Sequence, residues 1–402
     1  MRPFTSTIPF SEALRLVVEA AVPMSRTERV ALTEAGGRVL AHDLVAATDV
    51  PPFNRAAMDG YAVIAADTAG SSASSPRVLR RIDRVFTGQA PRMAVTPGTC
   101  IEVATGAPMP DGADAVVMVE DTDQSGEQIG IRAAVSAGLH IGRRGADLKS
   151  GDVVVRAGDV ISPARVGAIA ATGATGVDVF ARPSVALLST GNEIVEPGQP
   201  LAPGHIYDIN RFTLGAIVER HGGIASSLPI AGDTVDDLSQ GLDRALGHDV
   251  IVFSGGSSVG ERDLILDVLR QRGTIRFHGV AVKPGKPTAF GSIGTTPVFG
   301  MPGYPTSCLS NGYMLLVPFL RRVARLPPWT PRTIDAPLAR RVTSASGRHQ
   351  FYTVRLVKGI AEPAFKASGD ITSMANADGY FEIDSDVDAV EAGTQVTITL
   401  FD

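Results

Sequence analysis

The chain has 402 residues with a formal net charge of −5, and 44% of its residues are apolar, 20% charged and 5% aromatic. These values are typical of a globular protein large enough for two to four domains. The negative charge and the scarcity of aromatic side chains argue against a nucleic-acid partner. Because no apolar run reaches about 18 residues and the start does not resemble a signal peptide, we expect no membrane association and a cytoplasmic location. The two cysteines, Cys100 and Cys308, lie in apolar strings without the spacing of a zinc site or a disulfide framework.

The first part of the chain is predicted to be helical. Residues 9–21 repeat apolar side chains with a 3.6-residue period, and Ser11 is a plausible N-cap. Residues 30–46 predict a second helix, broken near Gly36 and Gly37. A third helix is predicted at 163–171, where proline occupies the favoured first turn. We expect the N-terminal helices to pack with the segment that contains this third helix, around an inserted β module.

The rest of the chain changes period twice. Residues 63–142 contain short apolar runs separated by Gly, Pro, Asp and Ser clusters, which predicts an all-β segment. Residues 179–326 alternate strands with helices, which indicates an α/β domain with a largely parallel sheet. A proline-rich boundary, LPPWTPRT, precedes short strands that predict a small terminal β domain. The α/β strands are expected at 184–189, 223–230, 249–256, 275–282 and 297–300.

Polar and glycine-rich strings follow each predicted α/β strand, where an open α/β sheet binds its ligands. They read TGNE (190–193), AGD (231–233), SGGSSVGERD (254–263), KPGKP (283–287) and MPGYPTS (301–307). If the strands are parallel, three carboxylates and two ammonium groups meet at one edge: those of Glu193, Asp233, Asp263, Lys283 and Lys286. Clustered like charges repel each other, so a bound Mg²⁺ with an anionic substrate would reconcile them. Carboxylate oxygens suit Mg²⁺, while lysines and loop N–H groups suit phosphate or another oxyanion.

The string SGGSSVGERD has two open interpretations. A glycine-serine loop between a strand and a helix places N–H groups where anions bind, but the same letters also fit a plain tight turn. Neither a Walker A loop nor a dinucleotide GxGxxG string occurs in the sequence. Residues 256–260 match GxSxG, which would make Ser258 the nucleophile of a serine hydrolase with His278 or His349 as its base. This alternative is weakened because Ser258 follows the apparent strand end by about five residues, whereas the hydrolase elbow is very sharp.

Taken together, the strings resemble the molybdopterin molybdotransferase family, which includes bacterial MoeA and the E domains of gephyrin and its plant counterpart. The resemblance covers nearly the whole chain. Four positions depart from the usual motifs: Asn54, Ala56, Asn192 and Tyr304 stand where the family has Asp, Ser, Asp and Asn. VKPGKPT with PGYPTSC looks more like archaeal-type paralogues, which leaves both molybdate and tungstate open. The matching strings are PPFNRAAMDGYA (51–62), TGAPMPDGADAVVMVED (105–121), RRGADLKSGDVV (143–154), STGNEI (189–194), SGGSSVGERD (254–263), VKPGKPTAFG (282–291) and GMPGYPTS (300–307).

The resemblance implies a multidomain α/β plus β fold and a homodimer. Residues 179–326 would form a MogA-like three-layer α/β domain that binds molybdopterin. Residues 46–142 would be an inserted β domain, residues 1–45 with 143–178 a split helical domain, and residues 327–402 a C-terminal β-barrel-like domain. Each active cleft would lie between the α/β domain of one subunit and the inserted domain of the other.

The implied reaction inserts molybdate, or tungstate, into adenylylated molybdopterin and releases AMP with the help of Mg²⁺. Implied partners are a MogA-like adenylyltransferase and molybdoenzyme-maturation proteins. A molybdopterin-binding scaffold without turnover is the alternative from another class. The implied catalytic residues are Asp59, Glu193, Asp233, Asp263, Lys283 and Lys286, and Glu193, Asp233 and Asp263 are also the implied metal ligands. The implied cofactor-binding residues are Thr105, Asp147, Thr190, Gly191, Ser254, Gly255, Gly256, Ser257, Pro302, Pro305, Arg348 and Ser368.

Overall fold

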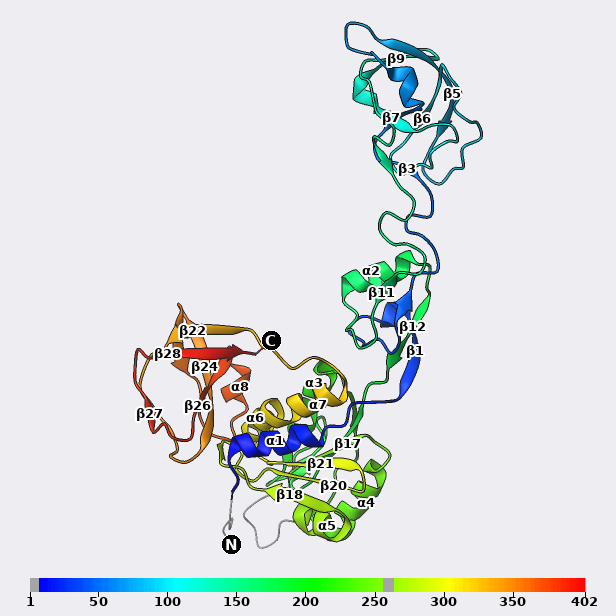
Figure 1. Cartoon of the computed structure of the whole chain (residues 1–402). Coiled ribbons are helices and arrows are strands. Elements are labelled where there is room, and N and C mark those ends of the chain that lie inside the picture. Colours follow the sequence, from blue (N-terminus) through cyan, green and yellow to red (C-terminus); the bar gives the residue numbers. More distant parts are fainter. Residues whose placement is uncertain (1–6, 256–263, 402) are drawn as a thin grey trace. The chain divides into compact units, whose positions relative to one another are not determined.

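A computed structural model describes residues 7–255 and 264–401 of the chain. The chain divides into two compact units, one made of Met1–Glu28 with Phe180–Asp402 and the other of Arg29–Val179. Among the described residues, no helix is both long and apolar enough to cross a membrane. Each unit is described by itself (Figure 1).

The first unit is built on a mixed sheet with the strand order β16-β13-β17-β21-β20-β18. The first four strands are parallel neighbours, β20 is antiparallel to β21, and β18 is antiparallel to β20. Since two reversals restore the direction, β18 runs the same way as the parallel strands, and its carboxyl end lies at the same edge. The sequence reading missed β20. The strands are β13 (Ser184–Ser189), β16 (Ile224–Ser227), β17 (Val250–Ser254), β18 (Thr274–His278), β20 (Ala289–Ile293) and β21 (Thr296–Met301), with β14 (Ile194–Val195) and β15 (Ile206–Tyr207) paired outside this sheet.

Helices cover both faces of this sheet, which gives the three-layer arrangement that was predicted (Figure 1). Successive strand residues point to opposite faces. Accordingly, Val185 and Leu187 belong to one apolar core with α1, α3 and α7, whereas Ala186 and Leu188 belong to another with α4 and α5. The helices are α1 (Phe10–Ala20), α3 (Asn210–Arg220), α4 (Val235–Ala245), α5 (Leu264–Arg272), α6 (Pro305–Asn311) and α7 (Val317–Val323), with the π-helical turn η4 (Gly312–Leu316) joining α6 to α7.

Helix α1 packs on the α/β unit and not against the segment around 163–171, as was predicted. It begins at Phe10 with Pro9 as the N-cap residue, so Ser11 is not the cap. The chain after the helix is fixed to the end of α7, because the Met24 amide donates to the Val323 carbonyl at 2.8 Å. The prediction that this helix packs with the segment around 163–171 is therefore wrong. Its apolar side chains are buried against η4 and α7 instead.

The second predicted helix, at 30–46, is also wrong. Strand β1 (Thr27–Ala31) pairs there with β12 (Gly176–Phe180), and only the short 3₁₀ turn η1 (Leu32–Glu34) follows it. Pairing with β12 outweighs the local helical pattern, and Gly37 has a left-handed φ of 77° that a helix does not allow. The third predicted helix is confirmed as α2 (Pro163–Ala171), whose cap Ser162 accepts from the Arg165 amide at 3.3 Å. Strands β2 (Leu44–Val45) and β11 (Val153–Val155) pair beside it.

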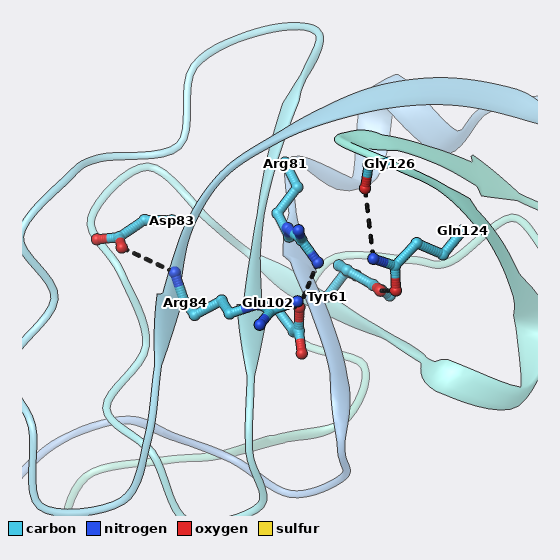
Figure 2. A network of polar contacts seen from close by, with 7 residues as sticks. All are labelled: Tyr61, Arg81, Asp83, Arg84, Glu102, Gln124 and Gly126. Atoms are coloured by element: carbon cyan, nitrogen blue, oxygen red, sulfur yellow. Dashed lines mark hydrogen bonds and ion pairs between the residues drawn. The ribbon is translucent and has the colours of Figure 1, made fainter.

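The segment between these pieces is all-β, as predicted. Its main sheet has the order β7-β4-β6-β5-β9-β8, and β3 pairs with β10 beside it. On this sheet Arg81 and Arg84 both donate to the carboxylate of Glu102, at 2.8 and 2.7 Å (Figure 2). The elements are β3 (Arg55–Ala56), β4 (Gly60–Val63), η2 (Ala65–Thr68), β5 (Arg77–Val85), β6 (Thr99–Val103), β7 (Ala115–Met118), η3 (Val119–Asp121), β8 (Thr122–Ser125), β9 (Gln128–Ile131) and β10 (Ile141–Gly142).

The chain after 327 forms the predicted terminal β domain within the first unit. Its sheet has the order β19-β24-β26-β28-β22, with β25 added on β24. Strand β19 (Val282–Lys283) comes from the α/β domain and places Lys283 beside Gln350 of β24. The lysine-containing loop thus joins the two domains. The elements are β22 (Thr333–Pro337), β23 (Val342–Thr343), β24 (His349–Val357), β25 (Ile360–Pro363), α8 (Thr372–Ala375), β26 (Gly379–Ile383), β27 (Ala389–Val390) and β28 (Gln395–Leu400).

One ion pair fixes the N-terminal segment to the start of the α/β sheet. Arg26 donates to both oxygens of Asp249, at 2.6 and 2.8 Å, and Asp249 also accepts from the amide and hydroxyl of Ser184 at 2.8 and 2.9 Å. Burial by itself raises the pKa of the Asp249 carboxyl, but these donors outweigh burial, and the pKa is lowered.

We expect Asp249→Ala to lower the free energy of unfolding of this unit by about 1–3 kcal/mol, because the part-buried amide and hydroxyl of Ser184 and the guanidinium of Arg26 would lose their acceptor. Thermal or urea unfolding checks this at neutral pH. Glu391→Ala, at an exposed pair with Arg341 of 3.0 Å in the same unit, is the control and should change little. Since the folded-state pKa of Asp249 is lowered, its contribution is present above the unfolded-state pKa and is lost as the pH falls through the folded-state value. An effect that stays constant well below pH 4 would contradict the assignment.

Candidate active site

The loops after β13 and β17 touch each other at the carboxyl edge of the sheet. The Ser189 and Ser254 hydroxyls lie 3.2 Å apart, and the Thr190 amide donates to the Ser254 carbonyl at 2.9 Å. Gly255 has a left-handed φ of 99°, and a Cβ added there would lie 2.3 Å from the Thr190 carbonyl oxygen. Only glycine fits so close a backbone approach. The Thr190 hydroxyl is buried and has no hydrogen-bond partner among the described residues, so it is available to a ligand.

The loops after β13 and β16 hold two of the predicted carboxylates. The Asn192 amide donates to Oδ2 of Asp233 at 2.9 Å, and the Asp233 amide donates back to Oδ1 of Asn192 at 3.3 Å. The Gly191 amide donates to the Ala231 carbonyl at 3.2 Å. The carboxylate of Glu193 folds over Gly191, where an added Cβ would be 2.6 Å from Oε2. The structure therefore brings Glu193 and Asp233 onto adjoining loops, both exposed to solvent.

The KPGKP loop is hydrogen-bonded to a buried asparagine of α6, Asn311. Nδ2 of Asn311 donates to the Gly285 carbonyl at 2.9 Å, and the Thr288 hydroxyl donates to the same carbonyl at 2.8 Å. A Cβ added to Gly285 would lie 2.2 Å from Nδ2 of Asn311. Both Lys283 and Lys286 are half-buried in this loop. The lysines are thus carried by a backbone whose shape is fixed by its neighbours.

The PGYP loop contacts α3, the loop of Gly255 and the C-terminal domain. Nδ2 of Asn210 donates to the Gly303 carbonyl at 2.8 Å. A Cβ added to Gly303 would lie 3.4 Å from the Cα of Gly255. The Thr306 amide and hydroxyl donate to the carbonyls of Ser368 and Asp370, each at 3.0 Å. Pro302 is buried and Pro305 is half-buried beside these contacts. Ser368 of the C-terminal domain therefore lies against the start of α6.

The remaining predicted residues fall into three places. Arg348 is half-buried and immediately precedes β24, the partner of β19. In the second unit the Thr105 amide donates to Oδ1 of Asp59 at 2.6 Å, and this bond holds the pKa of the Asp59 carboxyl below its ordinary value. Asp147 is exposed, and its amide donates to the Val50 carbonyl at 3.0 Å. Four residues lie outside the described part of the chain: Gly256, Ser257, Ser258 and Asp263.

The donor types at this edge match the oxygen preference of Mg²⁺. Glu193 and Asp233 offer carboxylate oxygens from adjoining loops, and such oxygens are the usual protein ligands of Mg²⁺. Within the described ranges, no group of three His, Cys, Asp or Glu side chains could hold a metal ion. The third predicted ligand, Asp263, falls in the gap between 255 and 264. The metal assignment therefore remains a prediction.

The contacts of His349 argue against this residue as the base of a serine hydrolase. Both ring nitrogens of His349 face carboxylates: Nε2 lies 2.5 Å from Glu382 and Nδ1 lies 3.5 Å from Asp384. The imidazole also stacks on Phe10, with the ring centroids 4.5 Å apart. His349 therefore connects the start of α1 with the C-terminal sheet, and Ser258, the candidate nucleophile, lies outside the described residues.

The sequence reading missed two residues that hold the site loops, Asn210 and Asn311. Each is a buried asparagine whose amide nitrogen binds a loop carbonyl and whose Oδ1 has no partner among the described residues. The signal in the sequence was a polar residue inside an apolar helical run, as in CLSNGYMLL. Such residues need a hydrogen-bond partner when buried, which points to a neighbouring loop.

We expect Asn311→Ala to raise the KM for the oxyanion substrate, because the lysine loop would lose a buried hydrogen bond worth about 1–3 kcal/mol when its partner is removed. Steady-state kinetics with varied molybdate, the oxyanion that the resemblance implies, checks this. Ser310→Ala is the matched control: Ser310 is also buried in α6, but its hydroxyl donates only to Ser307 within the helix. An equal KM in both variants would contradict the positioning role of Asn311.

The fold and the site define an α/β protein that carries carboxylates, lysines and glycine-rich backbone on the loops at the carboxyl ends of its strands. Family models agree with this description: the MoeA N-terminal region (domain I and II) matches residues 8–173, a probable molybdopterin binding domain matches 186–322, and the MoeA C-terminal region (domain IV) matches 335–401. The chain belongs to the MoeA family.

Individual relatives extend over the whole chain. A protein of Mycobacterium tuberculosis named molybdopterin molybdenumtransferase 2 is 36% identical and covers 95% of this chain and 97% of its own length. A putative molybdopterin biosynthesis protein of Methanocaldococcus jannaschii is 31% identical over the full length of both. A solved molybdopterin biosynthesis MoeA protein from Pyrococcus horikoshii is 38% identical, with a TM-score of 0.85 and coverage of 99% of this chain and 100% of that one.

Proposed function

We propose that this protein is a molybdopterin molybdotransferase that inserts molybdate into adenylylated molybdopterin during molybdenum cofactor biosynthesis and releases AMP. The observation that carries the proposal is the meeting of the strand-end loops at one edge of the α/β sheet. There Thr190, Gly191 and Gly255 adjoin the loop of Asp233. Asn210 of α3 binds the PGYP loop, and Asn311 of α6 binds the lysine loop. Relatives named for this transfer reaction match along almost the entire chain.

The chemistry assigned to each group follows from its type. Lys283 and Lys286 would hold the tetrahedral oxyanion, because ammonium groups on a fixed loop stabilise negative charge without reorganisation. The backbone at Ser254 and Gly255 would contact the phosphates of the substrate. Mg²⁺, when bound, would be held by Glu193, Asp233 and Asp263 and would withdraw charge from the pyrophosphate linkage. The buried hydroxyl of Thr190 would donate to the same ligand.

The proposal includes a homodimer. Asp59, Thr105 and Asp147 would complete the site from the other subunit, and this would explain why residues of the second unit carry family motifs. The bond between Asp59 and Thr105 fixes the shape of that surface. The proposal also includes domain boundaries at 45/46, 142/143, 178/179 and 326/327. It further includes the partner proteins that supply the substrate and receive the product.

The test is AMP release from adenylylated molybdopterin by the purified protein with Mg²⁺, followed by chromatography, with molybdate and tungstate in parallel. We expect AMP to appear only when an oxyanion is present, and the faster oxyanion identifies the metal that the enzyme inserts. Tight binding of the pterin without AMP release would instead show a scaffold protein. That outcome would overturn the enzyme proposal while leaving the family assignment intact.

A further inference from the structure

Tyr304 is an exposed aromatic residue at the rim of the candidate active site. The residue is 66% exposed. On one side, its neighbour Gly303 lies against Gly255 of the glycine-serine loop. On the other side, a Cβ added to Gly369 would lie 3.7 Å from Cδ1 of the Tyr304 ring. The loop that carries Tyr304 therefore contacts two loops to which the resemblance assigns cofactor-binding residues, those of Gly255 and Ser368, and the ring itself packs beside the second.

The fold does not use the Tyr304 side chain for its own hydrogen bonding at this helix start. Tyr304 is the N-cap residue of α6, but its side chain makes no capping hydrogen bond. Its carbonyl accepts from the Cys308 amide at 2.9 Å, a bond that any residue would make. The contacts with the C-terminal loop are made by the Thr306 amide and hydroxyl. What the tyrosine adds is a flat aromatic face, most of it open to solvent.

A flat, exposed aromatic face beside an anion-binding loop fits a ligand that carries both phosphate and a planar ring. Base–aromatic stacking contributes about 1–3 kcal/mol per base and depends on the π face rather than on the identity of the base.

We propose that the Tyr304 ring stacks on a planar heteroaromatic ring of the substrate and thereby determines which ligands this site accepts. The inference rests on the proposed function, in which the substrate carries a purine ring and a pterin ring joined through a pyrophosphate. Stacking on either ring uses the same chemistry. Separate ligands in the experiment distinguish the two.

The experiment measures binding to the full-length protein by calorimetry with three probes: AMP, pterin-6-carboxylate and ribose 5-phosphate, the last carrying phosphate without a planar ring. Three variants separate the properties of the side chain. Tyr304→Phe keeps the ring, Tyr304→Leu keeps apolar bulk without a flat face, and Tyr304→Ala removes both. The melting temperature of each variant reports whether the packing on Gly369 is maintained.

We expect Tyr304→Ala and Tyr304→Leu to weaken binding of AMP or of the pterin by about fivefold or more, and Tyr304→Phe to stay within about twofold. Ribose 5-phosphate should bind equally to all four proteins. Equal binding of both ring ligands to every variant, or wild-type affinity in the leucine variant, would overturn the stacking role. A parallel loss of ribose 5-phosphate binding would also overturn it, because it would show a distorted loop. If the wild-type protein binds neither ring ligand, the stacking role is overturned. AMP release from adenylylated molybdopterin by the wild type, measured in parallel, decides separately whether the proposed function stands.

Discussion

Lys283→Ala is expected to lower kcat/KM for molybdate by about 10²–10³, the usual cost of removing one charge-stabilising donor from a preorganised site. The residue is suited to this role because β19 fixes its backbone beside Gln350 while Asn311 holds the following Gly285. The backbone that carries its side chain thus has little freedom to lose when the oxyanion binds. Steady-state AMP release at varied molybdate measures the effect.

Two comparison variants make the result specific. Lys283→Arg keeps the charge but replaces a point charge with a planar fork, so it should recover only part of the activity. Lys358→Gln removes an exposed lysine from the C-terminal domain and should leave the kinetics unchanged. If Lys283→Ala changed kcat/KM no more than Lys358→Gln does, the lysine loop would not be the oxyanion site.

Gly255→Ala is expected to reduce turnover by about 10² or more, because a shift of about 1 Å in catalytic loops has an effect of this size. The added Cβ would lie 2.3 Å from the carbonyl oxygen of Thr190, so one of the two backbones must move. The left-handed φ of 99° adds strain of about 1–3 kcal/mol. Activity and the melting temperature should therefore both fall.

A matched glycine tests whether this effect is local. Gly247 lies before β17 in the same unit, and a Cβ there would meet nothing within 4 Å. Gly247→Ala should therefore be active and as stable as the wild type. Full activity of Gly255→Ala would show that Thr190 and Gly255 need not be in close contact for the reaction, and would remove this pair from the site.

The sequence was enough to predict the strand ends and the loops that follow them. An apolar β-branched run followed by a glycine-rich string marks such a position clearly, as at Val250–Ser254. The antiparallel pairing of β20 with both β21 and β18 could not be predicted from the sequence. Because of these two reversals, however, the KPGKP loop lies at the carboxyl edge of the parallel strands, as expected. The loops that carry Glu193, Asp233 and the two lysines therefore lie at one edge although the sheet is not fully parallel, whereas Asp263 lies outside the described residues.

The predictions from sequence are wrong where contacts between distant parts of the chain outweigh the local residue pattern. Residues 30–46 have a helical composition, but β1 pairs with β12 from a segment about 150 residues later, which local periodicity does not reveal. Similarly, nothing near α1 in sequence indicates that it packs against α7. The hydrogen bonds of Asn210 and Asn311 to the loops were not predicted for the same reason, because only the folded chain shows which carbonyl a buried amide binds.

We propose that release of AMP is coupled to insertion of the oxyanion. A single-turnover experiment tests it directly: enzyme in excess over adenylylated molybdopterin is mixed with Mg²⁺ with and without molybdate, and AMP and pterin-bound molybdenum are measured over time. We predict one molybdenum inserted for each AMP released, and no AMP without molybdate. AMP release at the same rate without molybdate would contradict the account, because the protein would then be a hydrolase of the adenylylated pterin and not a molybdotransferase.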